Sequence, residues 1–276
     1  MLEERREGMH LALKRFVKET LKRFDIRIAR YGNIQRLEEN PRNGNVLEML
    51  LDCRYAHSAQ LVLQDGQLLK AIRNSKSQLG QDIFALFEVG FKEGGYFVEF
   101  GATNGVSLSN TYVLEKEFAW GGILAEPAMR WHRDLMKNRH CQIESRCVWR
   151  DSHSILTFNE TGEGEYSTID AFSSSDDHNH VRTKGRKYGV PTISLEDMLD
   201  KYKAPKRIDF LSIDTEGSEY EILSGFDFDK YEFGAITCEH NFSPQREKVF
   251  SLLTAKGYRR QLEGISSFDD WYVRAV

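Results

Sequence analysis

The chain has 276 residues, of which 40% are hydrophobic and 12% aromatic, so it can form one large α/β domain with an appendage, or two small domains. Its formal net charge of −4 gives no overall reason to expect nucleic-acid binding. No apolar run approaches the roughly 20 residues that cross a bilayer, and the charged N-terminus lacks the apolar core of a signal peptide. The four cysteines show no C-x-x-C spacing, which favours reduced thiols in a cytoplasmic protein.

A basic amphipathic helix is predicted from Leu11 to about Tyr31, with apolar side chains at three- and four-residue steps and basic ones on the other face. Such a helix can lie on an anionic membrane surface, or it can pack on the main domain or on a second subunit. More helical pattern follows a break at residues 40–45. We therefore assign residues 1–74 to an N-terminal helical extension, as a peripheral or homo-oligomeric contact, and residues 75–276 to the main domain.

A polar segment stands just before the first predicted strand. Ser77, Gln78 and Gln81 are close enough along the chain to reach the ligand-bearing end of that strand. Asp82 is predicted as the N-cap of an apolar helix that runs from Ile83 to Phe91.

The stretch from Tyr96 to Gly105 carries most information, because a buried strand that ends in glycines and leads into a helix is how α/β proteins bind nucleotide-like ligands. Gly101 permits a sharp turn, and Gly105 removes a Cβ where we expect a ligand to approach. The pattern E-x-G-A-x-x-G is one glycine short of the dinucleotide pattern. It begins with Glu99, an acid that needs a cationic or hydrogen-bonding partner and repels phosphate. We therefore predict S-adenosylmethionine as the ligand; an ordinary strand-to-helix turn is the alternative.

The second strand, Gly122 to Pro127, also ends in an acid. Glu126 follows the glycine turn at the distance where a carboxylate holds the two ribose hydroxyls of a nucleotide. The alternative is a helix-start acid that complements the helix dipole. A third strand is predicted near Ile143 to Trp149, and its last residues, including Val148, are expected beside the adenine ring.

A short strand is predicted from Ser154 to Phe158, and a loop from Asn159 to about Tyr188. The loop is rich in Gly, Ser, Asp and His, and loops of this length are usually functional or disordered. We expect it to cover or select the acceptor substrate. His178 and His180 suggest metal binding, but a solvated polar loop is favoured because nothing rigid holds them.

Two further strands end in acidic or His residues. The run from Ile208 leads to Asp214, and the next strand leads to Glu239 and His240. The ends of neighbouring parallel strands meet in space, so these three side chains are expected to converge. Segments 258–262 and 271–276 read as two closing strands that are antiparallel to each other.

The chain resembles the FkbM family of class I S-adenosylmethionine-dependent methyltransferases over roughly residues 75 to 275. The matching segments occur in the family's order: Ser77–Asp82, Phe97–Gly105, Glu126–Pro127, Asp214–Glu219 and Glu239–His240. The resemblance implies a Rossmann-like, seven-stranded sheet that is mostly parallel with one antiparallel edge strand. It also implies O-methylation of a hydroxyl on a sugar or on a glycosylated or polyketide natural product, so that the partner is a small-molecule or glycan acceptor. The cofactor site is then expected at Gln81, Glu99, Gly101, Ala102, Asn104, Gly105, Glu126, Pro127, Val148 and Asp214.

The chemistry of methyl transfer to a hydroxyl indicates what the strand ends supply. A hydroxyl is a poor nucleophile at neutral pH, so it needs a general base or a metal. His240, with an ordinary pKa near 6.5, and Asp214 are the candidate catalytic residues. Asp214, Glu239 and His240 are also candidate ligands for a divalent cation such as Mg²⁺, which would clamp two substrate oxygens. The alternative is that these acids only cap turns and bond to loops.

Two other functions remain open from the sequence. One is a non-catalytic, methyltransferase-like subunit that uses the basic N-terminal helix as its contact. The other is a nicotinamide-dependent oxidoreductase, which the missing glycine disfavours.

Overall fold

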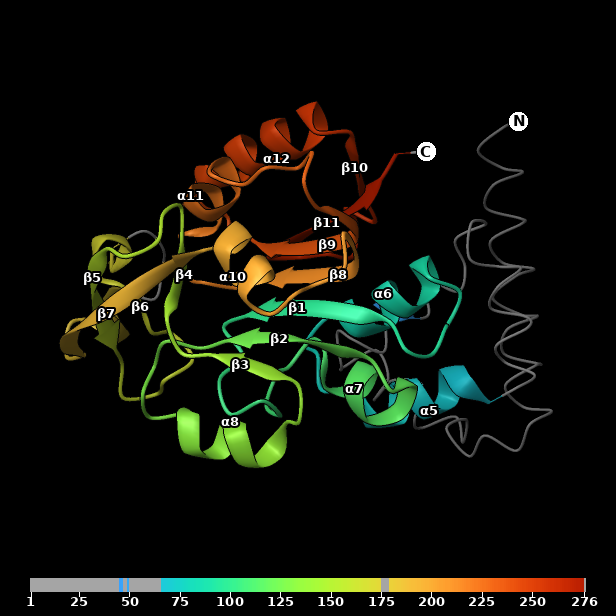
Figure 1. The fold of residues 1–276 in the computed structure, drawn as a ribbon, viewed down its shortest axis with the longest axis horizontal. Coiled ribbons are helices and arrows are strands. Elements are labelled where there is room, and N and C mark those ends of the chain that lie inside the picture. Colours follow the sequence, from blue (N-terminus) through green and yellow to red (C-terminus); the bar gives the residue numbers. More distant parts are fainter. Residues whose placement is uncertain (1–44, 47–48, 50–65, 175–178, 276) are drawn as a thin grey trace.

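The computed structural model describes residues 45–46, 49, 66–174 and 179–275 (Figure 1). The predicted basic helix at residues 11–31 and His178 lie outside these residues. Seven strands form the central sheet in the order β10-β11-β9-β8-β1-β2-β3. Their bounds are β1 Tyr96–Phe100, β2 Gly121–Ala125, β3 Gln142–Glu144, β8 Arg207–Ile213, β9 Glu232–Glu239, β10 Tyr258–Gln261 and β11 Asp269–Arg274.

The strand order places a topological switch point in the middle of the sheet. The chain moves outward from β1 through the parallel neighbours β2 and β3, then returns to β8 on the other side of β1 and continues to β9. Ligands of such sheets bind where the order reverses, at the carboxyl ends of the strands. A ligand site is therefore expected at the carboxyl ends of β1 and β8.

The antiparallel strand is not at the edge, where it was expected. β11 pairs antiparallel with both β9 and β10, so β10 is the edge strand and runs parallel to the rest of the sheet. The chain crosses over to the edge first and then returns as a hairpin between β10 and β9.

Helices cover both faces of the central sheet (Figure 1). On β1, Phe97 is buried with α5, α6, α7 and α8, and Val98 is buried with α10, α11 and α12 on the opposite face. The bounds are α5 Gln67–Asn74, α6 Gln81–Glu88, α7 Tyr112–Phe118, α8 His132–Asn138, α10 Leu195–Lys201, α11 Glu219–Ser224 and α12 Gln245–Ala255. Leu68 and Ala71 of α5 share the core of the main domain, so the segment just before residue 75 packs on that domain.

Asp82 lies one residue inside its helix and does not cap it. Helix α6 begins at Gln81 with Gly80 at the N-cap, and the Asp82 carboxylate accepts hydrogen bonds from Ser77 Oγ at 2.7 Å and from Ile83 N at 2.8 Å.

A second, small sheet lies beside the central one and has the order β4-β7-β5-β6. Its strands are β4 Cys147–Trp149, β5 Ile155–Glu160, β6 Thr168–Ile169 and β7 Arg186–Ser194, with the short helices η2 Asp170–Phe172 and α9 Asn179–Arg182 between β6 and β7. The predicted third strand is thus two strands in different sheets, β3 and β4. The segment 159–188, predicted as a loop, also contains β6, η2, α9 and the ends of β5 and β7. The small sheet buries a core around Phe158, Ile169 and Val190.

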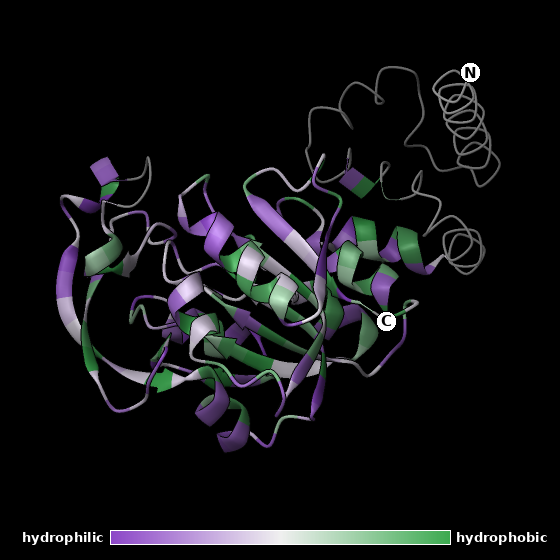
Figure 2. Cartoon of the chain, turned by 90° about the horizontal axis from the view of Figure 1, so that it is seen from above, coloured by the Kyte–Doolittle hydropathy of each residue, from purple (hydrophilic) through white to green (hydrophobic). Residues whose placement is uncertain are grey.

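The distribution of hydrophobic residues fits this architecture. In Figure 2 the central strands are largely hydrophobic and the helices that cover them are mixed, as expected for a sheet that is buried on both faces. None of the described helices has the length and apolarity that a bilayer span requires.

Candidate active site

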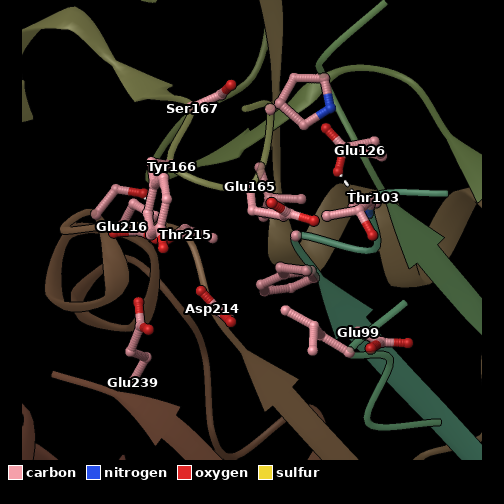
Figure 3. Close-up of a pocket in the computed structure, with 18 of the residues that line it drawn as sticks. Glu99, Thr103, Glu126, Glu165, Tyr166, Ser167, Asp214, Thr215, Glu216 and Glu239 are labelled. Carbon is pink, nitrogen blue, oxygen red and sulfur yellow. Dashed lines mark hydrogen bonds between the residues drawn. The ribbon is translucent and has the colours of Figure 1, made fainter. Parts of the chain in front are cut away.

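A cavity of about 330 Å³ opens at the carboxyl ends of β1, β2, β8 and β9 (Figure 3). Its size is at the lower end of the range of small-molecule sites, and it lies at the switch point of the sheet. Of the predicted site residues, Glu99, Gly101, Glu126, Pro127, Val148, Asp214 and Glu239 line it.

Two glycines of the first turn are required by neighbouring protein groups. Gly101 has φ of 76°, and a Cβ there would overlap the backbone oxygen of Asp214, so the turn must be a glycine for the end of β8 to approach β1. At Gly105, with φ of 77°, a Cβ would lie 2.6 Å from Arg139 Cγ and 2.7 Å from Leu135 Cδ1. The expectation that a ligand approaches Gly105 is therefore corrected: helix α8 occupies that space.

Glu99 faces cationic and hydrogen-bonding partners, as the sequence predicts. Its carboxylate accepts hydrogen bonds from Ser109 Oγ at 3.0 Å and Asn110 N at 2.7 Å, and from the Thr111 hydroxyl, while Arg139 Nη1 lies 3.8 Å away. Figure 3 shows this carboxylate pointing away from Asp214. Glu99 thus fixes the loop that leads into α7, and its oxygens already have protein donors.

Arg139 is the buried cation of this region, and sequence reasoning missed it. Its side chain is fully buried and donates to Glu115 Oε2 at 2.7 Å, Gly105 O at 3.1 Å and Thr111 Oγ1 at 2.9 Å. It directly follows the last residue of α8, a helix of mostly polar residues, so its sequence context indicates a surface position. Only the tertiary packing of the helix end against the first turn buries it.

Glu126 lies at the end of β2 and reaches the cavity. Its Oε2 accepts a hydrogen bond from Thr103 N at 2.7 Å and its Oε1 accepts one from Ala128 N at 2.8 Å. Burial raises the pKa of Glu126 to about 7; the two N–H donors oppose this shift, and the charges of Asp214 and Glu160 add to it. The two backbone bonds hold a buried carboxylate at the place where a nucleotide's ribose hydroxyls are expected.

The remaining predicted cofactor residues are not among those that line the cavity. Gln81 donates to Asp269 Oδ2 at 2.8 Å, Asn104 accepts from Val106 N and Ser107 N to shape the turn, and Ala102 packs in the core. Val148, which was expected beside the adenine ring, lines the cavity together with Cys147, Phe158 and Ile169. Gln78 and Thr103 also line it, so the predicted polar segment contributes Gln78 in place of Gln81.

Asp214 and Glu239 come together at the ends of β8 and β9, with Glu216 beside them (Figure 3). One carboxylate oxygen from each of the three acids lies within 4.8 Å of the others. Burial raises the pKa of Asp214 to about 6; its hydrogen bond with Glu239 opposes the shift, and the charges of Glu219 and Glu99 add to it. Burial and the charge of Asp214 raise the pKa of Glu239 well above the ordinary range. The two buried acids therefore share a proton as a pair.

His240 does not join these acids. Its Nδ1 accepts from Phe242 N at 2.9 Å, its Nε2 lies 3.8 Å from Asp270 Oδ1, and it lines a separate small pocket with Arg246 and Tyr272. Glu239 is the last residue of β9, and successive side chains of a strand point to opposite faces, so His240 turns away from the cavity. The predicted convergence of Asp214, Glu239 and His240 is thus corrected.

The chemistry of the acidic group fits a shared proton better than a divalent cation. The predicted ligand His240 is absent from it, and the Glu216 carboxylate lies 2.7 Å from Nη2 of Arg182. That guanidinium already neutralises one of the three acids, and hard cations of this class require several oxygen ligands. We therefore derive no step through a metal.

The small sheet forms the outer wall of the cavity through Glu165, Tyr166 and Ser167 (Figure 3). The Arg182 side chain is fully buried, donates from Nε to Tyr166 O at 2.9 Å and pairs with Glu216, whose own backbone has φ of 59°. One guanidinium thus joins this wall to the turn after β8.

Replacing Arg182 with alanine is expected to lower the free energy of unfolding by about 3–5 kcal/mol, because it removes the cation that faces the buried Glu216 carboxylate. Denaturant unfolding measures the change. The matched control is Lys187→Ala, which removes an exposed ion pair with Asp170 and is expected to change stability by about 1 kcal/mol or less. A loss of similar size in both variants would show that the Arg182 pair does not anchor the wall.

A sequence model described as the methyltransferase FkbM domain matches residues 99–261, which is more than half of the chain. No curated protein matches. Among solved structures, the FkbM methyltransferase of Methylobacillus flagellatus is similar at 11% identity and a TM-score of 0.43, with 81% of this chain and 61% of that chain covered. A precorrin-6y C5,15-methyltransferase of Geobacter metallireducens is similar at 11% identity and a TM-score of 0.39, with 68% and 75% covered.

The family match spans the strand ends that build the cavity, from Glu99 on β1 through Glu126 and Asp214 to Glu239. It also includes the small sheet that closes the outer wall. On this match, the chain belongs to the FkbM methyltransferase family.

Proposed function

We propose that the protein is an S-adenosylmethionine-dependent O-methyltransferase that acts on a hydroxyl of a sugar or of a glycosylated or polyketide natural product. The observation that carries the O-methyl assignment is the pair Asp214 and Glu239, which offers one ionised carboxylate at the cavity wall. The acceptor class follows from the family resemblance.

The residues of the cavity suit the cofactor. Glu126 presents a carboxylate for the ribose hydroxyls, and Val148 with Phe158 and Ile169 offers apolar surface for the adenine. When bound, S-adenosylmethionine supplies an electrophilic methyl group on a positively charged sulfur. The acidic walls at Asp214 and Glu239 favour such a cation electrostatically.

Asp214 is the proposed general base. It would accept the proton that the acceptor hydroxyl loses as the oxygen bonds to the methyl carbon, while the methyl–sulfur bond breaks and the donor leaves as a neutral thioether. General bases of this kind contribute roughly 10²- to 10⁴-fold to the rate. Glu239, which keeps its proton, hydrogen-bonds Asp214 and lets it remain ionised in a site with several acids. Tyr166 and Phe268 add aromatic surface to the lining of the cavity.

The rate should follow the ionisation of Asp214. Because a base acts only when ionised, kcat is expected to rise with pH through about 6 and to level off above it, so that kcat at pH 5 is about tenfold lower than the plateau. Saturating cofactor keeps the titration of Glu126, with its pKa of about 7, out of the profile. A flat profile between pH 5 and 8 would rule out Asp214 as the base.

The proposed function is tested by incubating the protein with S-adenosylmethionine and a panel of free sugars, glycosides and hydroxylated polyketides. Mass spectrometry and NMR then identify a methyl ether, and a parallel incubation with EDTA is expected to give the same turnover. Methylation at carbon or nitrogen would overturn the O-methyl assignment, and loss of turnover that added Mg²⁺ restores would show that a metal takes part. Absence of cofactor binding in calorimetry would favour the non-catalytic subunit.

A further inference from the structure

Asn110, a residue of the cavity wall, carries a buried side-chain acceptor without a hydrogen-bond partner among the described residues. It lies in the loop between β1 and α7, is 8% exposed and lines the cavity. Its backbone N–H donates to Glu99 Oε1 at 2.7 Å, and its side-chain Nδ2 donates to Ser212 Oγ at 3.0 Å. Among the described residues, its Oδ1 has no hydrogen-bond partner. A buried acceptor in this state is destabilising, so the site is built for a donor that the protein does not supply.

The position of Asn110 indicates which part of the cofactor reaches it. Ser212 on β8 stands opposite Glu99 in the strand register, so the amide lies at the junction of β1 and β8. Glu126 ends β2, on the other side of β1. A ligand whose ribose is held at Glu126 therefore presents its amino-acid end, not its adenine, toward Asn110.

The charges around Asn110 select the donor. Glu99 bonds directly to its backbone, and Asp214 lies at the end of the adjacent strand β8. No Lys, Arg or His is present among the described residues that line the cavity. An amino-acid end carries an ammonium and a carboxylate, and these surroundings attract the ammonium and repel the carboxylate.

We propose that the side-chain carbonyl of Asn110 accepts a hydrogen bond from the α-ammonium group of S-adenosylmethionine, with Ser212 holding the amide in the required orientation. This inference rests on the proposed function, and it adds a cofactor-binding residue that recognises the amino-acid half specifically. It predicts that Asn110 distinguishes ligands with that half from ligands without it.

Calorimetry with two ligands tests the prediction. S-adenosylhomocysteine carries the ammonium, and 5′-methylthioadenosine has the same adenosine half without it. Asn110→Ala is expected to weaken S-adenosylhomocysteine about 10- to 100-fold, as for a lost hydrogen bond to a charged group, and to change 5′-methylthioadenosine by less than about twofold. The matched control is Asn74→Ala, which lies at the end of α5 outside the cavity wall and bonds to Glu117, and which should change neither affinity.

A second variant fixes the direction of the hydrogen bond. Asn110→Asp keeps an acceptor and removes the amide N–H₂, so S-adenosylhomocysteine is expected to bind at least as well as to the wild type. If the N–H₂ group instead met the ligand's carboxylate, this variant would bind more weakly than Asn110→Ala, which would overturn the proposal. Thermal unfolding of each variant confirms that it is folded before titration.

Failure of the proposed function and failure of the Asn110 proposal give different results. If the wild type binds neither ligand, the proposed function fails together with this inference. If the wild type binds both and Asn110→Ala weakens both equally or neither, the inference alone is overturned.

Discussion

Asp214→Asn is expected to lower kcat by about 10²- to 10⁴-fold, while the loss of one charge near the ligand's ammonium lowers S-adenosylhomocysteine affinity by at most about tenfold. Asparagine keeps the size and polarity of the side chain at the end of β8, but it cannot accept a proton. Because most of the loss is in the chemical step, it appears in kcat and in kcat/KM, whereas cofactor affinity by calorimetry changes much less. The variant should also lose the inflection near pH 6 in its rate profile.

Glu239→Gln is the matched partner of this experiment. Glutamine resembles the protonated form that we assign to Glu239, so this variant is expected to keep kcat within about tenfold of the wild type. Asp229→Asn, an exposed acid in the loop after α11, is the neutral control. Equal losses in Asp214→Asn and Glu239→Gln would place the base elsewhere or on the pair as a unit.

Glu126→Ala is expected to weaken S-adenosylhomocysteine and 5′-methylthioadenosine alike, by about 100-fold or more. Both ligands carry the ribose diol, and a hydrogen bond to a charged group contributes about 1.5–3 kcal/mol. The equal effect on both ligands contrasts with the selective effect expected for Asn110→Ala, so calorimetry with the same pair of ligands assigns each half of the cofactor to its own residue.

The backbone contacts of Glu126 require a check on folding. The substitution removes the acceptor for Thr103 N and Ala128 N, so unfolding midpoints must accompany the affinities. Glu263→Ala, an exposed acid beside Arg260, is expected to leave binding unchanged. Retention of wild-type affinity in a folded Glu126→Ala protein would remove this residue from the cofactor site.

The central sheet is predictable from the sequence because its strands are buried on both faces. Runs such as Phe97–Phe100 and Ile208–Ile213 are continuously apolar apart from Glu99, Asp209 and Ser212, and each ends in a glycine turn or an acid. The same rule locates Glu126 and Asp214 at one edge of the sheet. The rule fails for His240. This residue follows Glu239 directly in sequence, but successive side chains along a strand point to opposite faces, so His240 points away from the cavity.

Buried cations and the small sheet were not predictable in this way. Arg139 and Arg182 end or follow short polar helices, and their burial depends on partners distant in sequence, such as Gly105 and Glu216, each 34 residues away. The strands β5 and β7 alternate in burial only over short stretches, Leu156–Phe158 and Tyr188–Thr192, so the strand predicted at 154–158 finds only part of this sheet. In the sequence, Asn110 has the character of an ordinary turn residue. Only its hydrogen bond to Ser212 shows that it lies against β8.

The anchoring of the outer wall by Arg182 has a consequence for how the protein chooses its acceptors. A buried ion pair and the hydrogen bond from Thr168 Oγ1 to Glu216 O at 2.9 Å hold this wall in place. The size of the acceptor site should therefore be the same before and after the substrate binds. The protein should then select between acceptors by their size. An acceptor one ring larger than the natural one should not be methylated, and the kinetics should show no slow closure step.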